Sequence, residues 1–401
     1  MASCRTRVSS VSTIPLASLA VLMRYPPMRG LQRQQENNCM NAQRSRNPLD
    51  NKHDRASRNE VTRRLARLCG GVPSGRHDRF TRFDTSGRSS SYFVPRDTLV
   101  TQEASALGIT GENDLFGGVV PFRFVATKAV GHSLVAAPRA MPSGWNRDLG
   151  GLLDGSVLQG FSTFDRDDAF AAAATLLSQG PVRIKQVEAT AGRGQAVIRS
   201  MQELETELEA IDPEQIRTDG LVIEENLEAV RTYSVGSTKL CGMEIAYWGI
   251  QAITTDRDGQ TVYGGTRLQA VRGGLAELAA RPLARDVAEA VEKARRYDRL
   301  IFDTFPGMYA SRRNYDVASG QTPLGERRIG VLEQSWRVGG ATPAEIAAFE
   351  RFNAHPSCMD TICATVEIHG DADAAPPGAS VYYAGIDPIA GPMTKYAMVI
   401  E

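Results

Sequence analysis

The chain has 401 residues and carries 46 basic and 46 acidic side chains, with 42% hydrophobic residues. This length is enough for two or three domains, each with its own hydrophobic core. The balanced charge argues against a protein that binds nucleic acid or an anionic membrane through its overall charge. No stretch approaches the ~20 apolar residues that a membrane-spanning helix needs.

Basic residues outnumber acidic ones in the first 80 residues, which are mostly polar and without periodicity. We therefore expect a mostly disordered basic leader, since such a segment buries too little apolar surface to offset its chain entropy. A short helix is predicted near 61–69, where Val61, Leu65 and Leu68 recur at helical spacing. Met40 offers an alternative start, so the sequence leaves open whether residues 1–39 are translated.

Six cysteines are scattered along the chain without a repeated spacing: Cys4, Cys39, Cys69, Cys241, Cys358 and Cys363. This distribution favours reduced thiols over a disulfide framework, and it predicts a cytoplasmic protein.

The globular part is predicted to begin with a short region, residues 81–125, which contains a strand near 92–96 and leads into a second strand or turn over 117–127. A helix over 167–178 has acidic residues at its start and Gly180 after its end. Strands are predicted over 182–186, 195–198 and 220–226, with a helix from Met201 that a Ser200-x-x-Glu203 capping box starts.

Antiparallel strands are expected next, over 231–236, 241–255 and 260–271, followed by an amphipathic helix over 283–296. Two strands, 308–317 and 328–336, form a hairpin. A second capping box, Thr342-Pro-Ala-Glu345, predicts a helix that ends near His355. Short strands over 363–369 and 381–386 complete a chain of the α+β class.

One stretch is suited to holding phosphate. Lys185 ends a short apolar run, and Gly192-Arg193-Gly194 follows it as a turn. A lysine supplies a compact positive charge, and glycines let backbone N–H groups approach an anion. In a P-loop the lysine follows the glycines, whereas here it precedes them, so the stretch predicts a loop between two strands. An ordinary hairpin turn is the alternative.

The hairpin over 308–336 carries a second chemical signal. The period of two in a strand places Glu333, Ser335 and Arg337 on one face, with Gln334 and Trp336 on the other. Pairing of the two strands would set Asp316 beside Glu333. Two carboxylates and a hydroxyl form an oxygen-only site, which suits Mg²⁺, with Mn²⁺ as an alternative. Arg337, together with Arg312 or Arg313, would then face the charge of a transferred group.

These residues resemble the ATP-grasp superfamily, whose enzymes hold ATP between two α+β lobes. The resemblance covers Lys128 to Arg337 and implies that ATP is bound by residues in four places: Lys128, Lys185, the loop Gly192-Arg193-Gly194, and the hinge residues Glu224, Glu225 and Leu227. It implies that Asp316, Glu333 and Ser335 hold the metal. It also implies a small lobe over 126–225, a large lobe over 226–345, and a C-terminal extension over 346–401. Within the superfamily the chain is similar to a proteobacterial family of unknown function.

The resemblance implies an ADP-forming ligase that joins a small-molecule carboxylate to a nucleophile, an amine or thiol, through an acyl-phosphate. Two alternatives remain: a kinase that phosphorylates a hydroxyl, and a catalytically silent nucleotide-binding protein. The silent alternative is motivated by Ser335, which stands where the superfamily usually has Asn, and by Arg231-Thr-Tyr-Ser-Val, which lacks a usual Glu. The sequence predicts no nucleic acid or membrane partner and leaves substrates and oligomeric state open.

Overall fold

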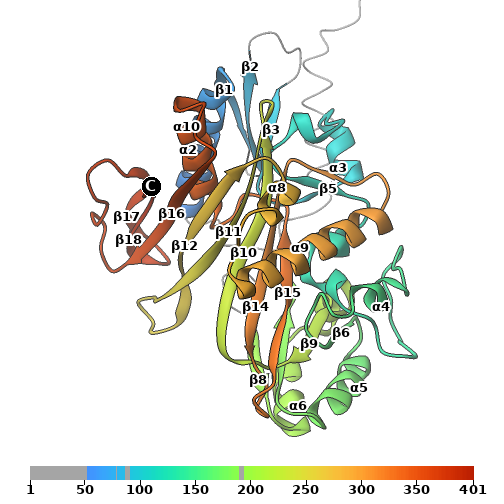
Figure 1. The fold of residues 1–401 in the computed structure, drawn as a ribbon. Helices are drawn as coiled ribbons and strands as arrows, with labels where there is room; N and C mark the ends of the chain where they lie inside the picture. The colour runs from blue at the N-terminus through green and yellow to red at the C-terminus, as the bar shows by residue number, and fades with distance from the viewer. Residues whose placement is uncertain (1–51, 78, 86–90, 189–193) are drawn as a thin grey trace, which may run out of the picture. The chain divides into compact units, whose positions relative to one another are not determined.

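The computed structural model describes residues 52–77, 79–85, 91–188 and 194–401, drawn in Figure 1. These residues form an α+β fold with two larger sheets, one of eight strands and one of four, and two three-stranded sheets. Within them, no helix is long and apolar enough to cross a membrane.

The part of the predicted leader that the structure describes is folded, so the prediction of a disordered leader up to residue 80 is wrong from residue 52 onward. Helix α2 spans Lys52–Leu68, longer than the helix predicted near 61–69, and it buries Val61 and Leu65 in a core with Phe83 and Phe349. Strands β1 (Gly71–His77), β2 (Phe80–Thr85) and β3 (Tyr92–Pro95) form an antiparallel sheet. The sequence of α2 is mostly polar because only one side of the helix is buried, and this composition led to the prediction of disorder. Residues 1–51 lie outside the described residues.

The cysteine prediction is also wrong for one pair. Cys69, directly after α2, forms a disulfide with Cys241, with a Cα–Cα distance of 5.6 Å. Cys241 lies in the turn between β10 and β11, so the bridge ties the N-terminal helix to the large sheet. The prediction of a cytoplasmic location rested on reduced thiols, and this disulfide removes that support.

Between these parts, the chain forms short elements that lead to the candidate site. They are β4 (Leu99–Val100), α3 (Thr101–Ala106), η1 (Glu112–Asp114), β5 (Gly118–Val120), η2 (Arg123–Ala126), η3 (Lys128–Gly131) and α4 (Leu149–Leu153). Strand β5 lies between β4 and β13 (Tyr309–Ala310) in a three-stranded sheet.

The four-stranded sheet has the order β6-β9-β7-β8. Its strands are β6 (Gly160–Thr163), β7 (Val182–Gln186), β8 (Gln195–Ile198) and β9 (Leu221–Glu225), and its helices are α5 (Arg166–Leu177), α6 (Met201–Glu209) and α7 (Pro213–Asp219). Ser200 accepts a hydrogen bond from the N–H of Glu203 at 3.2 Å, which confirms the predicted start of α6. Ile184 and Ile223 pack against the helices. Because side chains alternate along a strand, Lys185 and Glu224 lie on the opposite face.

The eight-stranded antiparallel sheet has the order β15-β14-β10-β11-β12-β16-β18-β17. Its strands are β10 (Glu228–Leu240), β11 (Met243–Thr255), β12 (Thr261–Arg272), β14 (Arg312–Gln321), β15 (Arg327–Ser335), β16 (Asp360–His369), β17 (Ser380–Asp387) and β18 (Gly391–Val399). The predicted C-terminal extension is therefore not separate, because β16, β17 and β18 continue this sheet (Figure 1).

Helices cover both faces of the large sheet. On one face lie α8 (Leu275–Ala279) and α9 (Arg285–Thr304), and α9 packs on β10, β14 and β15 through Val291, Ala294 and Tyr297. On the other face, α10 (Thr342–Ala354) packs on β12, β16 and β18 (Figure 1). The predicted helix at 342–355 is thus confirmed, but its predicted capping box is not, since the Glu345 side chain bonds Arg312 instead.

Candidate active site

The register of β14 and β15 brings together the two predicted metal carboxylates. Asp316 is paired with Glu333, and Asn314 with Ser335, so these side chains share one face of the sheet. Leu332 is an extra residue on β15, because Val317 pairs with Val331. Such a bulge is common beside functional sites. The predicted convergence of the two carboxylates is therefore present.

The two carboxyl groups titrate differently. Burial, and then the charge of Glu333, raise the pKa of Asp316 above its ordinary value, while hydrogen bonds from Gln251 and Asn314 act in the opposite direction. Burial also opposes ionisation of Glu333, but Lys128, together with Lys185 and Arg337, outweighs burial and lowers the pKa of that carboxyl. The pair therefore holds Glu333 charged and disfavours a second charge on Asp316 unless a cation is present.

Lys128 is held directly against this pair. Its Nζ lies 3.0 Å from Glu333 Oε2, and its side chain is only 5% exposed. The neighbouring residue on β15, Gln334, positions the segment before the lysine, because its amide nitrogen donates to the carbonyls of Val125 at 2.9 Å and Thr127 at 2.7 Å. Tyr297 of α9 donates to the amide oxygen of Gln334 at 2.8 Å. We predicted no role for Gln334 from the sequence, although it directly follows Glu333.

Lys185 is buried on the four-stranded sheet in an ion pair with Glu224. His132 Nε2 lies 3.5 Å from the second oxygen of Glu224. Burial opposes ionisation of Glu224, but the charge of Lys185 and the bond from His132 lower its pKa to about 2. Of the glycine loop, Gly194 has φ +62°, a backbone conformation that favours glycine. Gly192 and Arg193 lie outside the described residues.

The predicted hinge residues differ in their surroundings. Glu225 accepts a hydrogen bond from the N–H of Gln159 at 3.0 Å, and its carboxylate lies 3.6 Å from Arg328 of β15. Leu227 is buried. Glu225 is therefore in contact with both sheets, whereas Glu224 is enclosed with Lys185.

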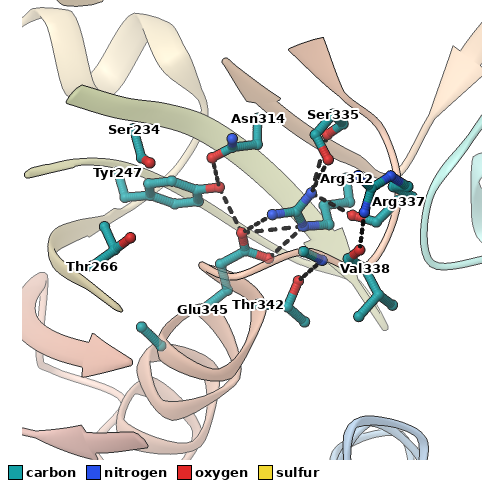
Figure 2. A network of polar contacts seen from close by, with 12 residues as sticks. Ser234, Tyr247, Thr266, Arg312, Asn314, Ser335, Arg337, Val338, Thr342 and Glu345 are labelled. Carbon is teal, nitrogen blue, oxygen red and sulfur yellow. Dashed lines mark hydrogen bonds and ion pairs between the residues drawn. The ribbon is translucent and has the colours of Figure 1, made fainter. Parts of the chain in front are cut away.

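The expectation that Arg312 meets a transferred group is wrong, because its guanidinium is buried in the fold. Figure 2 shows it between α10 and β15, where it binds Glu345 with Nε–Oε2 and Nη2–Oε1 distances of 2.9 and 2.7 Å. Its Nη1 donates to the carbonyls of Ser335, at 3.0 Å, and Arg337. Arg312 thus fixes the end of β15.

Arg313 does not fit its predicted role either, because it lies on the opposite face of the sheet from Asp316. Its Nη1 is 3.1 Å from Asp298 of α9, and its guanidinium lies 4.0 Å from the centre of the Phe302 ring. Two of the three predicted arginines act on the carboxylate pair through their charge: Arg337 helps to lower the pKa of Glu333, and Arg312 opposes the rise in the pKa of Asp316.

The donor set fits a hard divalent cation. Asp316, Glu333 and Ser335 supply oxygens only, and no group of three His, Cys, Asp or Glu side chains that could hold a metal occurs in the ranges that the structure describes. The further oxygens that Mg²⁺ requires would come from other side chains, water and a phosphate ligand. Two buried lysines beside the pair fit the phosphates of a nucleotide.

Comparisons with known proteins give a family and distant structural similarities. A family model described as "Protein of unknown function (DUF3182)" matches residues 41–397. No curated protein matches the chain.

Among solved structures, the chain is similar to an N5-carboxyaminoimidazole synthetase from Staphylococcus aureus complexed with ADP, with 14% identity and a TM-score of 0.39 over 63% of this chain and 66% of that one. The match thus spans slightly less than two thirds of that enzyme. A D-alanyl-alanine synthetase A from Vibrio cholerae has 12% identity and a TM-score of 0.41 over 77% of this chain and 90% of that one. A phosphoribosylamine–glycine ligase from Thermotoga maritima has 14% identity and a TM-score of 0.43 over 76% and 79%. Similarity at this level leaves the function to be argued from the chain's own residues.

Proposed function

The chain belongs to the DUF3182 family of proteins of unknown function, and from the chemistry of its two larger sheets we propose that it is an ADP-forming, ATP-dependent ligase. In this proposal ATP and Mg²⁺ bind between the four-stranded and the eight-stranded sheet. The substrates are a small-molecule carboxylate and a nucleophile, an amine or a thiol.

The observation that carries the proposal is the convergence of basic groups from separate segments on one carboxylate. Lys128 of η3 contacts Glu333, and Lys185 of the four-stranded sheet acts with it to lower the pKa of Glu333. Glu333 is itself paired with Asp316. A site with two lysines and two carboxylates matches the needs of a phosphate chain and a shared cation.

The proposal assigns each group a role. Lys128 and Lys185 bind phosphate oxygens, and Gly192, Arg193 and Gly194 keep their predicted role as a phosphate-binding loop. The hinge residues Glu224, Glu225 and Leu227 contact the adenosine part. Asp316 and Glu333, with Ser335, would hold Mg²⁺, which neutralises phosphate charge when it is bound.

The proposed reaction has two steps. A substrate carboxylate oxygen attacks the γ-phosphorus of ATP, the bond to the β-phosphate oxygen breaks, and ADP leaves. The nucleophile then attacks the acyl carbon of the acyl-phosphate, loses a proton, and displaces inorganic phosphate. Arg337 stabilises the charge on the transferred phosphoryl group.

The test begins with binding. Mg²⁺ with ADP or a non-hydrolysable ATP analogue should raise the melting temperature of the wild-type protein. Asp316→Asn and Glu333→Gln should lose most of that shift. Glu326→Gln is the matched control, because Glu326 lies in the exposed turn of the same hairpin, where it pairs with Arg328. The absence of any nucleotide-dependent shift in the wild type would refute the proposal.

Turnover is tested by ADP release from ATP in the presence of pooled carboxylates and amines. The ligase predicts release that depends on both substrate classes and is lost in Asp316→Asn. Release that requires only a hydroxyl compound would show a kinase instead. Nucleotide binding without turnover under any pool would show a silent nucleotide-binding protein.

A further inference from the structure

A small cavity of about 140 Å³ lies on the face of the eight-stranded sheet opposite to Asp316. Four of its lining residues come from neighbouring strands, where Ser237 is paired with Arg313, and Lys239 with Glu244. Paired residues share a face, and Arg313 is an odd number of residues from Asp316 on β14, so these four side chains point away from the candidate active site. Helices α8 and α9 supply the facing wall.

The two basic groups of the cavity already have acidic partners. Arg313 Nη1 lies 3.1 Å from Asp298 of α9. Lys239 Nζ lies 2.9 Å from Glu112 of η1, although Glu244 is directly opposite Lys239 on the next strand. Both positive charges are therefore balanced by carboxylates other than Glu244.

Glu244 is left with a hydroxyl as its partner. Ser237 Oγ donates to Glu244 Oε1 at 3.0 Å. In the part of the chain that the structure describes, this is the one hydrogen bond that the carboxylate accepts, and no basic side chain pairs with it. Glu244 is half-buried, and burial of a carboxylate is costly unless a cation or several donors compensate it. The cavity thus presents one carboxylate that has room for a positively charged donor.

The rest of the cavity is suited to a short carbon chain. Leu275 of α8 and Ala310 of β13 supply apolar surface. A cavity of about 140 Å³ is close in size to one that holds benzene, a molecule of about six non-hydrogen atoms. A bare divalent ion would need more oxygen ligands than Glu244 and Ser237 supply. The side chain of Lys239 is 42% exposed, so solvent reaches this end of the cavity.

We propose that this cavity binds a small organic amine in its ammonium form. The ammonium group donates to the carboxylate of Glu244, and the carbon chain lies against Leu275 and Ala310. Hydrogen bonds between two ionised groups are stronger than those between neutral groups, so the charge of the ligand supplies much of its affinity. The inference goes beyond the proposed function, because the cavity lies on the other face of the sheet from Asp316 and Glu333.

The experiment uses n-butylammonium as the probe, with 1-butanol and butanoate as its neutral and anionic analogues. Each is titrated into leucine-methyl-labelled protein without nucleotide, and NMR shift changes give the affinity. Butylammonium should bind at least about tenfold more tightly than either analogue. Glu244→Gln should weaken butylammonium binding by about ten- to a hundredfold, because glutamine keeps the acceptor for Ser237 but not the charge. Glu292→Gln is the matched control, since Glu292 is on the exposed side of α9, where it pairs with Arg295.

A second measurement uses the wild-type protein and does not depend on the stability of Glu244→Gln. Nuclear Overhauser effects should join the butyl chain to the methyl groups of Leu275, whose signals Leu275→Met identifies. Equal affinity for butylammonium and 1-butanol, an unchanged affinity in Glu244→Gln, or the absence of Overhauser effects at Leu275 would overturn the inference. Each of these results leaves the proposed function standing, because no nucleotide is present and the two sites share no residue. Failure of the protein to bind nucleotide would overturn the proposed function alone.

Discussion

The buried ion pair between Arg312 and Glu345 gives the sharpest prediction about stability. Arg312 and Glu345 are 1% and 0% exposed. Replacement of one partner leaves the other as an uncompensated charge in the interior, which costs about 3–5 kcal/mol of the free energy of unfolding. We expect that loss for Arg312→Met and for Glu345→Met.

The double variant Arg312→Met/Glu345→Met should recover most of this loss, because two apolar side chains of similar length replace the pair. Recovery is incomplete, since Arg312 also donates to the carbonyls of Ser335 and Arg337. A buried acceptor without a donor costs about 1–3 kcal/mol. The double variant should therefore be less stable than the wild type but more stable than Arg312→Met, which leaves the same two carbonyls without this donor and also leaves Glu345 unpaired.

Urea unfolding followed by tryptophan fluorescence measures these differences, and binding of Mg²⁺ with ADP is measured on the same proteins. If Arg312 only fixes the end of β15, the double variant keeps an ADP affinity within a few fold of the wild type. The reasoning would be refuted if Arg312→Met lost less than about 1 kcal/mol and yet no longer bound nucleotide. That result would show that Arg312 contributes to nucleotide binding, as the sequence predicted.

Two further predictions concern Glu224 and the disulfide. The pKa of Glu224 is about 2 in the folded protein against an ordinary value of 4.5, so its stabilising contribution is complete above pH 4.5 and is lost as the pH falls toward 2. The difference in unfolding free energy between the wild type and Glu224→Gln should therefore shrink by about 2 kcal/mol from pH 7 to pH 3, and a constant difference would contradict the assigned pairing with Lys185. The Cys69–Cys241 bridge closes a sequence separation of 172 residues, so Cys69→Ser should lower the free energy of unfolding by about 2–5 kcal/mol. Peptide mapping without reductant should recover the crosslinked peptides, and free thiols at both positions would count against the bridge.

Strand alternation was sufficient to predict the centre of the candidate site. A period of two placed Glu333 and Ser335 on one face and Gln334 on the other, and the short turn that closes the hairpin brought Asp316 opposite Glu333. These features depend on neighbours along the chain or across one turn, which sequence patterns describe well.

Features that depend on distant partners were missed. Glu345 matches a capping box, but its carboxylate bonds Arg312, 33 residues earlier in the sequence, and Tyr247. The sequence predicted that Arg312 binds phosphate, because an arginine beside a metal site suggests this role when its partner, here Glu345, is not known. A local pattern cannot distinguish a residue that caps its own helix from one that pairs across the core.

The same limit explains the N-terminal segment and its cysteine. Helix α2 is polar over most of its surface, and Leu65 becomes buried only because Phe83 and Phe349 pack against it. Cys69 meets Cys241 only after α2 has packed on the large sheet. The composition of a segment shows how much apolar surface it has, but not which other segments will pack on that surface.

The two internal ion pairs of the candidate site have a consequence for how a nucleotide and a cation would enter it. Lys128 is paired with Glu333, and Lys185 with Glu224. In the proposed function, a nucleotide that drew Lys128 to its phosphates would leave Glu333 without a counter-charge, and a cation at Glu333 would lie against Lys128. When both bind together, Lys128 pairs with phosphate and Glu333 with the cation, so that neither charge is left unpaired. Each ligand therefore strengthens binding of the other, and by linkage the effect is the same in both directions.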